Sequence, residues 1–143
     1  MRLQQLYTSA TLQNDGALAI SGKVTRLGST TFEITARSEE ATAVYACQNR
    51  DGNLPEDPKK QTVSRPVLAT TGELPTPDDG QVRFQSLTLE APDSILRRSG
   101  GQRIVLASIS YEDVQLRLFE NGALVGKFSL GPFSEVFFSE VFE

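Results

Sequence analysis

The chain has 143 residues with 14 basic and 18 acidic side chains, which gives a formal net charge of −4. This length favours one domain, residues 1–143, with a core of its own. The negative balance, without clustered Lys or Arg, argues against a nucleic-acid-binding surface. No apolar run reaches the roughly 18 residues that a membrane-spanning helix needs. Because the chain contains no histidine, histidine-dependent nucleophilic mechanisms are excluded.

Apolar and polar residues alternate along most of the chain, which predicts strands and not helices. Gly, Asn, Asp and Pro mark the turns, most strongly at Asn14-Asp15-Gly16 and at Glu120-Asn121-Gly122. A helical turn is expected at 94–98, and the stretch 49–60 is expected to be a surface loop. The predicted strands are residues 3–12, 17–25, 31–37, 41–48, 61–71, 81–90, 102–111, 113–119 and 123–130.

Some of these strands carry signs of irregularity. Val82 and Phe84 share one phase, but the apolar residues that follow take the other, which predicts a β-bulge near Gln85–Ser86. Pro66 cannot donate to a ladder, so its strand belongs at a sheet edge or at a switch between sheets. Gly131-Pro132 is expected to end the strand before it.

Short strands joined by turns, with no helices between them, predict an antiparallel β-sandwich. We expect an all-β, immunoglobulin-like fold of about eight or nine strands with Greek-key connections. A closed barrel is the alternative. Strands 41–48 and 102–111 are apolar on both faces and are expected at the centre of a sheet. The predicted core is Leu18, Ile20, Phe32, Ile34, Val44, Tyr45, Val82, Phe84, Leu106, Ile109, Val114, Leu116 and Phe128.

The C-terminal segment 132–143 contains the sequence FSEVF twice. A repeat of odd length changes faces between its copies when it forms a strand, so both faces of this segment are apolar. Such a strand either closes its own sandwich or adds to the sheet edge of a second copy or of another protein. The residues that would make this subunit contact are Phe133, Val136, Phe137, Phe138, Val141 and Phe142.

The residues able to support catalysis or metal binding are few. Cys47 is the only cysteine, so an intrachain disulfide is impossible, and its place in a strand predicts a small buried residue. Neighbouring carboxylates on a strand point to opposite faces, so they cannot flank a bond as glycosidases require. Those pairs are Glu39–Glu40, Glu56–Asp57, Asp78–Asp79 and Glu112–Asp113.

Oxygen-rich turns leave a calcium site open as an alternative. Asp51-Gly52-Asn53 and Asp78-Asp79-Gly80 supply oxygen ligands, but neither matches an EF-hand loop and both are ordinary turn formers. We expect no catalytic residue, no cofactor and no metal.

Three segments occur in a recognisable order. Residues 45–55 read YACQNRDGNLP, residues 101–116 read GQRIVLASISYEDVQL, and residues 131–138 read GPFSEVFF. Together with the Asp15-Gly16 turn, they resemble a family of small secreted bacterial β-sandwich proteins of unknown function. The family pattern is YxCxNxGGNxP, then GQxxVLASxSY, then FSxxFF.

The resemblance implies a compact exported β-sandwich without an assigned activity, and it supplies no catalytic or ligand residue. Cys47 matches the first cysteine of a pair that is expected to form a disulfide in the family. Arg98 occupies the place of the second, so this chain lacks that disulfide. Residues 1–7 lack the apolar region of a signal peptide. An extracellular location by resemblance and a cytoplasmic one therefore both remain open.

The expected function is a non-enzymatic β-sandwich that acts as a surface binding or assembly module, with itself or another protein as partner. The first alternative is a structural subunit of an extracellular filament or particle, assembled by edge-strand addition through 132–143. The second is a carboxylate-dependent hydrolase, which would need a cleft with two carboxyl groups roughly 5–10 Å apart.

Overall fold

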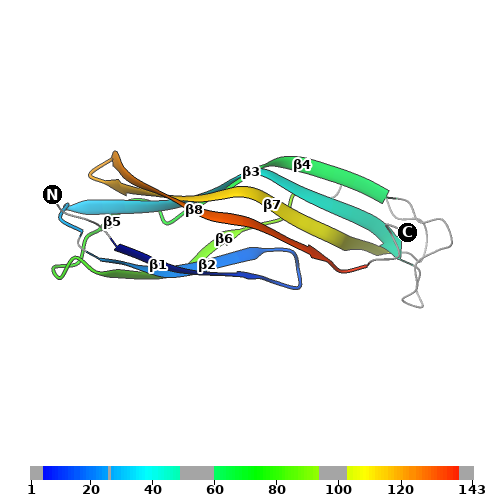
Figure 1. Cartoon of the computed structure of the whole chain (residues 1–143), viewed down its shortest axis with the longest axis horizontal. Coiled ribbons are helices and arrows are strands. Elements are labelled where there is room, and N and C mark those ends of the chain that lie inside the picture. The colour runs from blue at the N-terminus through cyan, green and yellow to red at the C-terminus, as the bar shows by residue number, and fades with distance from the viewer. Residues whose placement is uncertain (1–4, 26, 49–59, 94–102, 139–143) are drawn as a thin grey trace.

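The structure, a computed structural model, describes residues 5–25, 27–48, 60–93 and 103–138. Within these residues the chain forms two stacked antiparallel sheets and no helix (Figure 1). The prediction of an all-β, two-sheet protein is confirmed, and the closed barrel is wrong. The strands are β1 (Gln5–Leu12), β2 (Leu18–Thr25), β3 (Thr31–Gln48), β4 (Lys60–Thr70), β5 (Leu74–Pro75), β6 (Val82–Leu89), β7 (Arg103–Glu120) and β8 (Ala123–Val136).

The smaller sheet has the order β1-β2-β6, and the larger has the order β4-β3-β7-β8 with β5 paired to β3. Hairpin partners such as β7 and β8 stay in one sheet, while the chain changes sheets after β2, β5 and β6. Figure 1 shows that the molecule is elongated and that the larger sheet extends past the smaller one at one end.

The larger sheet is built around two strands, β3 and β7, of 18 residues each. The predicted breaks after residue 37 and after residue 111 are wrong, because bulges replace the expected turns. The β3–β4 register shifts between Ser38 and Ala41, and the β7–β8 register shifts between Tyr111 and Val114. Each bulge moves the inward-facing phase by one residue, so the pairing continues and the apolar side chains still face the core.

Strand β8 also continues beyond its predicted end. It runs through Gly131 and Pro132 to Val136, and Gly131 adopts a positive φ of 85° at a register shift with β7. Because β8 is an edge strand, the missing N–H of Pro132 is tolerated there. The edge position predicted from Pro66 is confirmed for β4 by the same reasoning.

The predicted bulge in β6 is confirmed. Ile20 pairs with Leu87 and Gly22 pairs with Phe84, so β6 carries one residue more than β2 between these pairs, at Gln85–Ser86. The bulge lets both ends of β6 direct apolar side chains into the core.

The core lies between the two sheets, and the inner strands β3 and β7 confirm the predicted central strands. Most of the predicted core residues are buried in it or packed against it. Val44 is the exception: it packs with Ala46 and Ala107 in a separate small cluster. Tyr45 faces the main core, so its neighbour Val44 must point to the opposite side of β3. The buried core residues include Leu18, Ile20, Phe32, Ile34, Phe84, Ile109, Tyr111, Val114 and Leu116.

Candidate binding surface on the three-stranded sheet

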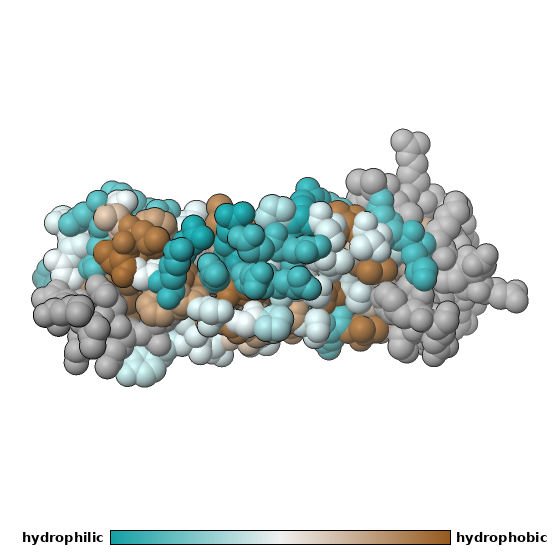
Figure 2. Space-filling view, turned by 45° about the horizontal axis from the view of Figure 1, so that its top comes forward, coloured by the Kyte–Doolittle hydropathy of each residue, from teal (hydrophilic) through white to brown (hydrophobic). Residues whose placement is uncertain are grey.

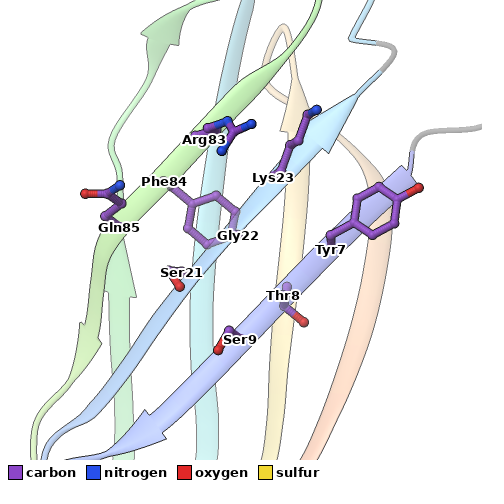
Figure 3. Close-up of a pocket in the computed structure, with 9 residues that line it drawn as sticks. All are labelled: Tyr7, Thr8, Ser9, Ser21, Gly22, Lys23, Arg83, Phe84 and Gln85. Carbon is purple, nitrogen blue, oxygen red and sulfur yellow. The ribbon is translucent and has the colours of Figure 1, made fainter.

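Three long side chains form a row across the outer face of the smaller sheet. Tyr7 of β1 lies directly opposite Lys23 of β2, and Lys23 lies directly opposite Arg83 of β6. Val24 and Phe84, the neighbours of Lys23 and Arg83, are buried in the core, so Lys23 and Arg83 point away from the larger sheet. Tyr7 is paired directly with Lys23 and lies on the same face. Figure 3 shows the row and the strand that supplies each side chain.

Shorter polar side chains lie next to this row. Ser9 is paired with Ser21, and Gln85 lies at the β6 bulge beyond them. The change from long to short side chains leaves a depression of about 340 Å³. Its lining residues, labelled in Figure 3, are Tyr7, Thr8, Ser9, Ser21, Gly22, Lys23, Arg83, Phe84 and Gln85.

Gly22 allows the strands beneath this depression to approach closely. A Cβ at this position would collide with the carbonyl oxygen of Tyr7 and would lie 2.9 Å from Cζ of Phe84. The ring of Phe84 is buried, and it reaches the backbone of β2 beside the bulge. Strands β1 and β6 therefore pack closely against β2 beneath the depression.

The charge on this face has one sign. Lys23 and Arg83 are the only charged residues in the sequences of β1, β2 and β6. Like charges directly opposite each other on neighbouring strands repel and destabilise a sheet. No ion pair with either cation occurs in the ranges that the structure describes. A protein of net charge −4 therefore presents a cationic patch across one of its sheets.

The larger sheet mixes its charges. Arg37 Nη2 lies 4.0 Å from Glu39 Oε1. Thr70 Oγ1 donates a hydrogen bond of 2.7 Å to Glu33 Oε2. Figure 2, in which the larger sheet comes forward, shows hydrophilic side chains along the middle and an apolar patch toward one end. Leu124 and Val125, 45% and 41% exposed, lie at the β7–β8 hairpin. Arg117 of β7 and Lys127 of β8 are also directly paired on this sheet. Arg37 and the carboxylates of Glu33 and Glu39 lie on the neighbouring strand β3, so the larger sheet carries charges of both signs.

A second depression, of about 350 Å³, lies where the edges of β4 and β6 approach each other. It combines Arg65 with the carboxylates of Glu90 and Asp93. Beside it, the Tyr45 hydroxyl donates a hydrogen bond of 2.5 Å to the Pro92 carbonyl. Burial raises the pKa of Tyr45, the charge of Asp93 raises it further, and Arg65 opposes both. The opposite charges compensate one another here, unlike those around Lys23.

The predicted contact residues of the tail that the structure describes lie at the end of β8 and in the two residues that follow it. Phe133 and Phe137 pack against the protein's own core, and Phe138 packs against the Ala46–Ala107 cluster. The backbone N–H groups of Phe137 and Phe138 both donate to the Ala107 carbonyl. Val136 is 57% exposed. The last two predicted residues, Val141 and Phe142, lie outside the described residues.

Of the chemical candidates, Cys47 is buried, as predicted. Asp79 acts as a turn former: its Oδ1 accepts a hydrogen bond of 3.0 Å from the N–H of Gln81. The triplet 51–53, the pair 56–57 and the helical turn 94–98 lie outside the described residues. In the part of the chain that the structure describes, no group of three or more His, Cys, Asp or Glu side chains gathers. The same residues include no helix long and apolar enough to cross a membrane.

The sequence analysis did not identify Tyr7, Lys23 and Arg83 as site residues. The available signal was that Lys23 and Arg83 each stand alone as a charge in an otherwise uncharged strand. Their juxtaposition depends on the pairing of β2 with β6, which are separated in the sequence by three strands of the other sheet.

Comparison with protein-family models, with curated proteins and with solved structures finds no match. The family resemblance inferred from the sequence motifs therefore stays a prediction.

Proposed function

We propose that this protein is a non-enzymatic, immunoglobulin-like β-sandwich that works as a binding module and holds an anionic ligand on its three-stranded sheet. The observation that carries the proposal is the direct pairing of Lys23 with Arg83 beside a depression of about 340 Å³. An anion between the two side chains would relieve their repulsion and accept charge-assisted hydrogen bonds from both.

The immunoglobulin-like, Greek-key part of the proposal is supported by the strand order. Strands β1, β2 and β6 face β4, β3, β7 and β8, and the chain repeatedly changes sheets between them. This 3 + 4 division of the main strands is compatible with a sandwich of that class. Sandwiches of this class commonly serve as binding domains. The proposal also includes an extracellular location for this protein.

The depression is suited to binding because its lining combines hydrogen-bond donors and acceptors from three neighbouring strands. Lys23 and Arg83 carry only donors, and Ser9, Ser21 and Gln85 both donate and accept. The absence of histidine from the whole chain removes the commonest general base.

A carboxymethyl ion-exchange column at pH 7 and low salt tests the proposal. A protein of net charge −4 should pass through unless a local cationic patch holds it. We expect the unmodified protein to be retained and then eluted by salt, whereas the Lys23→Ala/Arg83→Ala double variant flows through. The matched control Arg37→Ala/Lys127→Ala removes the same charge from the larger sheet and should be retained like the unmodified protein. Flow-through of the unmodified protein, or equal loss of retention in the control, would overturn the proposal.

Self-assembly through the C-terminal segment is the second candidate, favoured by the exposure of Val136 near the end of edge strand β8. An edge strand with exposed apolar residues can add to a neighbouring sheet. Light scattering at micromolar concentration should then report a defined oligomer that dissociates when residues 134–143 are deleted. A monomer, or an oligomer whose size is unaffected by the deletion, contradicts assembly through this segment.

A further inference from the structure

We infer that the anionic ligand of the three-stranded sheet is an acidic polysaccharide, whose sugar carboxylates lie against Lys23 and Arg83. The inference rests on the proposed function and adds the chemical class of the ligand. It combines the two cations with an exposed aromatic ring, a set of neutral polar groups and a surface that runs from one edge of the sheet to the other.

The aromatic ring belongs to Tyr7, which is 59% exposed at the end of the row opposite Lys23. An aromatic face offers an apolar platform next to polar groups, which matches the C–H face of a pyranose ring. An inorganic anion has no such face and gains nothing from the ring. The Tyr7 side chain therefore favours the binding of a charged sugar over that of a bare anion.

The neutral polar side chains of the depression also favour a sugar over a bare anion. Ser9, Ser21 and Gln85 line the depression, and their hydroxyl and amide groups supply hydrogen-bond acceptors as well as donors. A fully ionised phosphate accepts hydrogen bonds but donates none, so it would use only the donors of these side chains and none of their acceptors. The hydroxyl groups of a sugar do both and can satisfy these side chains.

The shape of the surface favours a chain over a compact molecule. The row from Tyr7 to Arg83 crosses the whole smaller sheet, from edge strand β1 to edge strand β6. Its strands span roughly 10 Å at the usual strand spacing, close to the length of a disaccharide. Because the row reaches an edge strand of the sheet on both sides, it offers a linear contact surface and not an enclosed pocket.

The carboxylate would lie between the two cations. Side chains at directly paired positions start from Cβ atoms about 5 Å apart. The Arg83 guanidinium can hold a carboxylate through two parallel hydrogen bonds, and the Lys23 ammonium can add a third. A methyl-esterified sugar carries no charge there and should lose most of its affinity.

Isothermal titration with oligogalacturonate as the probe tests the inference, with its methyl ester and a polyphosphate of similar charge for comparison. We expect the uronate to bind more tightly than the polyphosphate, and the ester to bind at least tenfold more weakly because its charge-assisted hydrogen bonds are lost. Tyr7→Ala should weaken uronate binding by roughly tenfold, the upper end for an aromatic contact, and leave polyphosphate binding unchanged. Tyr7→Phe keeps the ring and should bind the uronate more tightly than Tyr7→Ala does.

The outcomes separate the two proposals. Equal binding of polyphosphate and uronate, with no effect of Tyr7→Ala, overturns the saccharide inference and leaves the anion-binding function standing. No binding of any anion, or binding that survives Lys23→Ala/Arg83→Ala, overturns both. Uronate binding that depends on all three side chains supports both.

Discussion

The hydroxyl of Tyr111 donates a hydrogen bond of 2.5 Å to the carbonyl oxygen of Gly16, which joins the middle of β7 to the turn between β1 and β2. The same hydroxyl lies 3.3 Å from the carbonyl oxygen of Leu89 at the end of β6. Tyr111 itself is completely buried. One side chain of the larger sheet thus fixes two ends of strands in the smaller sheet, the sheet that carries the candidate binding surface.

Replacing Tyr111 with Phe should destabilise the protein by about 1–3 kcal/mol, because buried carbonyl groups lose their donor while the packing of the ring is kept. Urea unfolding at pH 7, followed by circular dichroism, measures this difference. Ser134→Ala, which removes a hydroxyl at an exposed position, serves as the control and should stay within about 0.5 kcal/mol of the unmodified protein. Equal stability of all three proteins contradicts the importance of the Tyr111 hydrogen bond.

The stability gap of Tyr111→Phe should also depend on pH. Burial, with smaller contributions from Asp15, Tyr45 and Glu90, raises the pKa of Tyr111 above its ordinary value of about 10. Above pH 10 the unfolded chain gives up this proton while the folded protein keeps it, so the free energy of unfolding falls as the pH rises. Below pH 10 the Tyr111 hydroxyl makes its full contribution to the free energy of unfolding. Because Phe cannot ionise, the unmodified protein and Tyr111→Phe should differ less in their free energy of unfolding at pH 10.5 than at pH 8. A difference that grows between these pH values contradicts a raised pKa for Tyr111.

Gly22→Ala should destabilise the protein by about 1–3 kcal/mol, because its Cβ would meet the backbone of Tyr7 and the ring of Phe84. Thermal unfolding should show a lower melting temperature for this variant. Ser21→Ala, one residue away on the outward face, removes only a hydroxyl group and should melt close to the unmodified protein. A Gly22→Ala variant as stable as Ser21→Ala would show that β1 and β6 do not approach β2 so closely.

Ser38 is the buried polar residue at the β3 bulge, and its hydroxyl donates a hydrogen bond of 2.6 Å to the Glu112 carbonyl of β7. Ser38→Ala leaves that carbonyl without its donor and should lower the free energy of unfolding by about 1–3 kcal/mol. Denaturant titration against Ser134→Ala, an exposed serine on β8, gives the comparison. If the two variants unfold at the same denaturant concentration, the Ser38 bond does not stabilise the bulge.

Cys47 should react with a thiol reagent such as dithionitrobenzoate only after the protein unfolds. Its side chain is 1% exposed, and burial keeps the reagent away from the sulfur. The native protein is expected to release almost no chromophore within minutes, and the protein in guanidinium is expected to release one equivalent at once. Fast reaction in the native state would show that the end of β3 opens readily or is uncovered.

The local features of this fold could be predicted from the sequence because their causes are local. Asn121-Gly122 adopts positive φ angles of 50° and 81°, as a two-residue hairpin turn requires, and the signal for it is in the residues themselves. The bulge at Gln85–Ser86 was visible as a change of phase. Alternation likewise identified most of the core.

The long strands and the candidate surface could not be predicted, because their causes are not local. Glu39-Glu40 looks like a turn, yet the pairing of β3 with both β4 and β7 holds it as a bulge. Lys23 and Arg83 are unremarkable outward residues until β2 and β6 are known to be neighbours. Val44 was assigned to the wrong face of its strand for a related reason. When both faces of a strand are apolar, alternation does not show which face lies in the core.

Amide chemical shifts, followed by NMR while oligogalacturonate is added, test the binding surface most directly. The shifts should move for residues of β1, β2 and β6 around Tyr7, Lys23 and Arg83, and the outer face of β4 and β8 should remain unchanged. Shifts confined to the larger sheet, or no shifts at saturating concentrations of the uronate, would contradict the assignment of this surface.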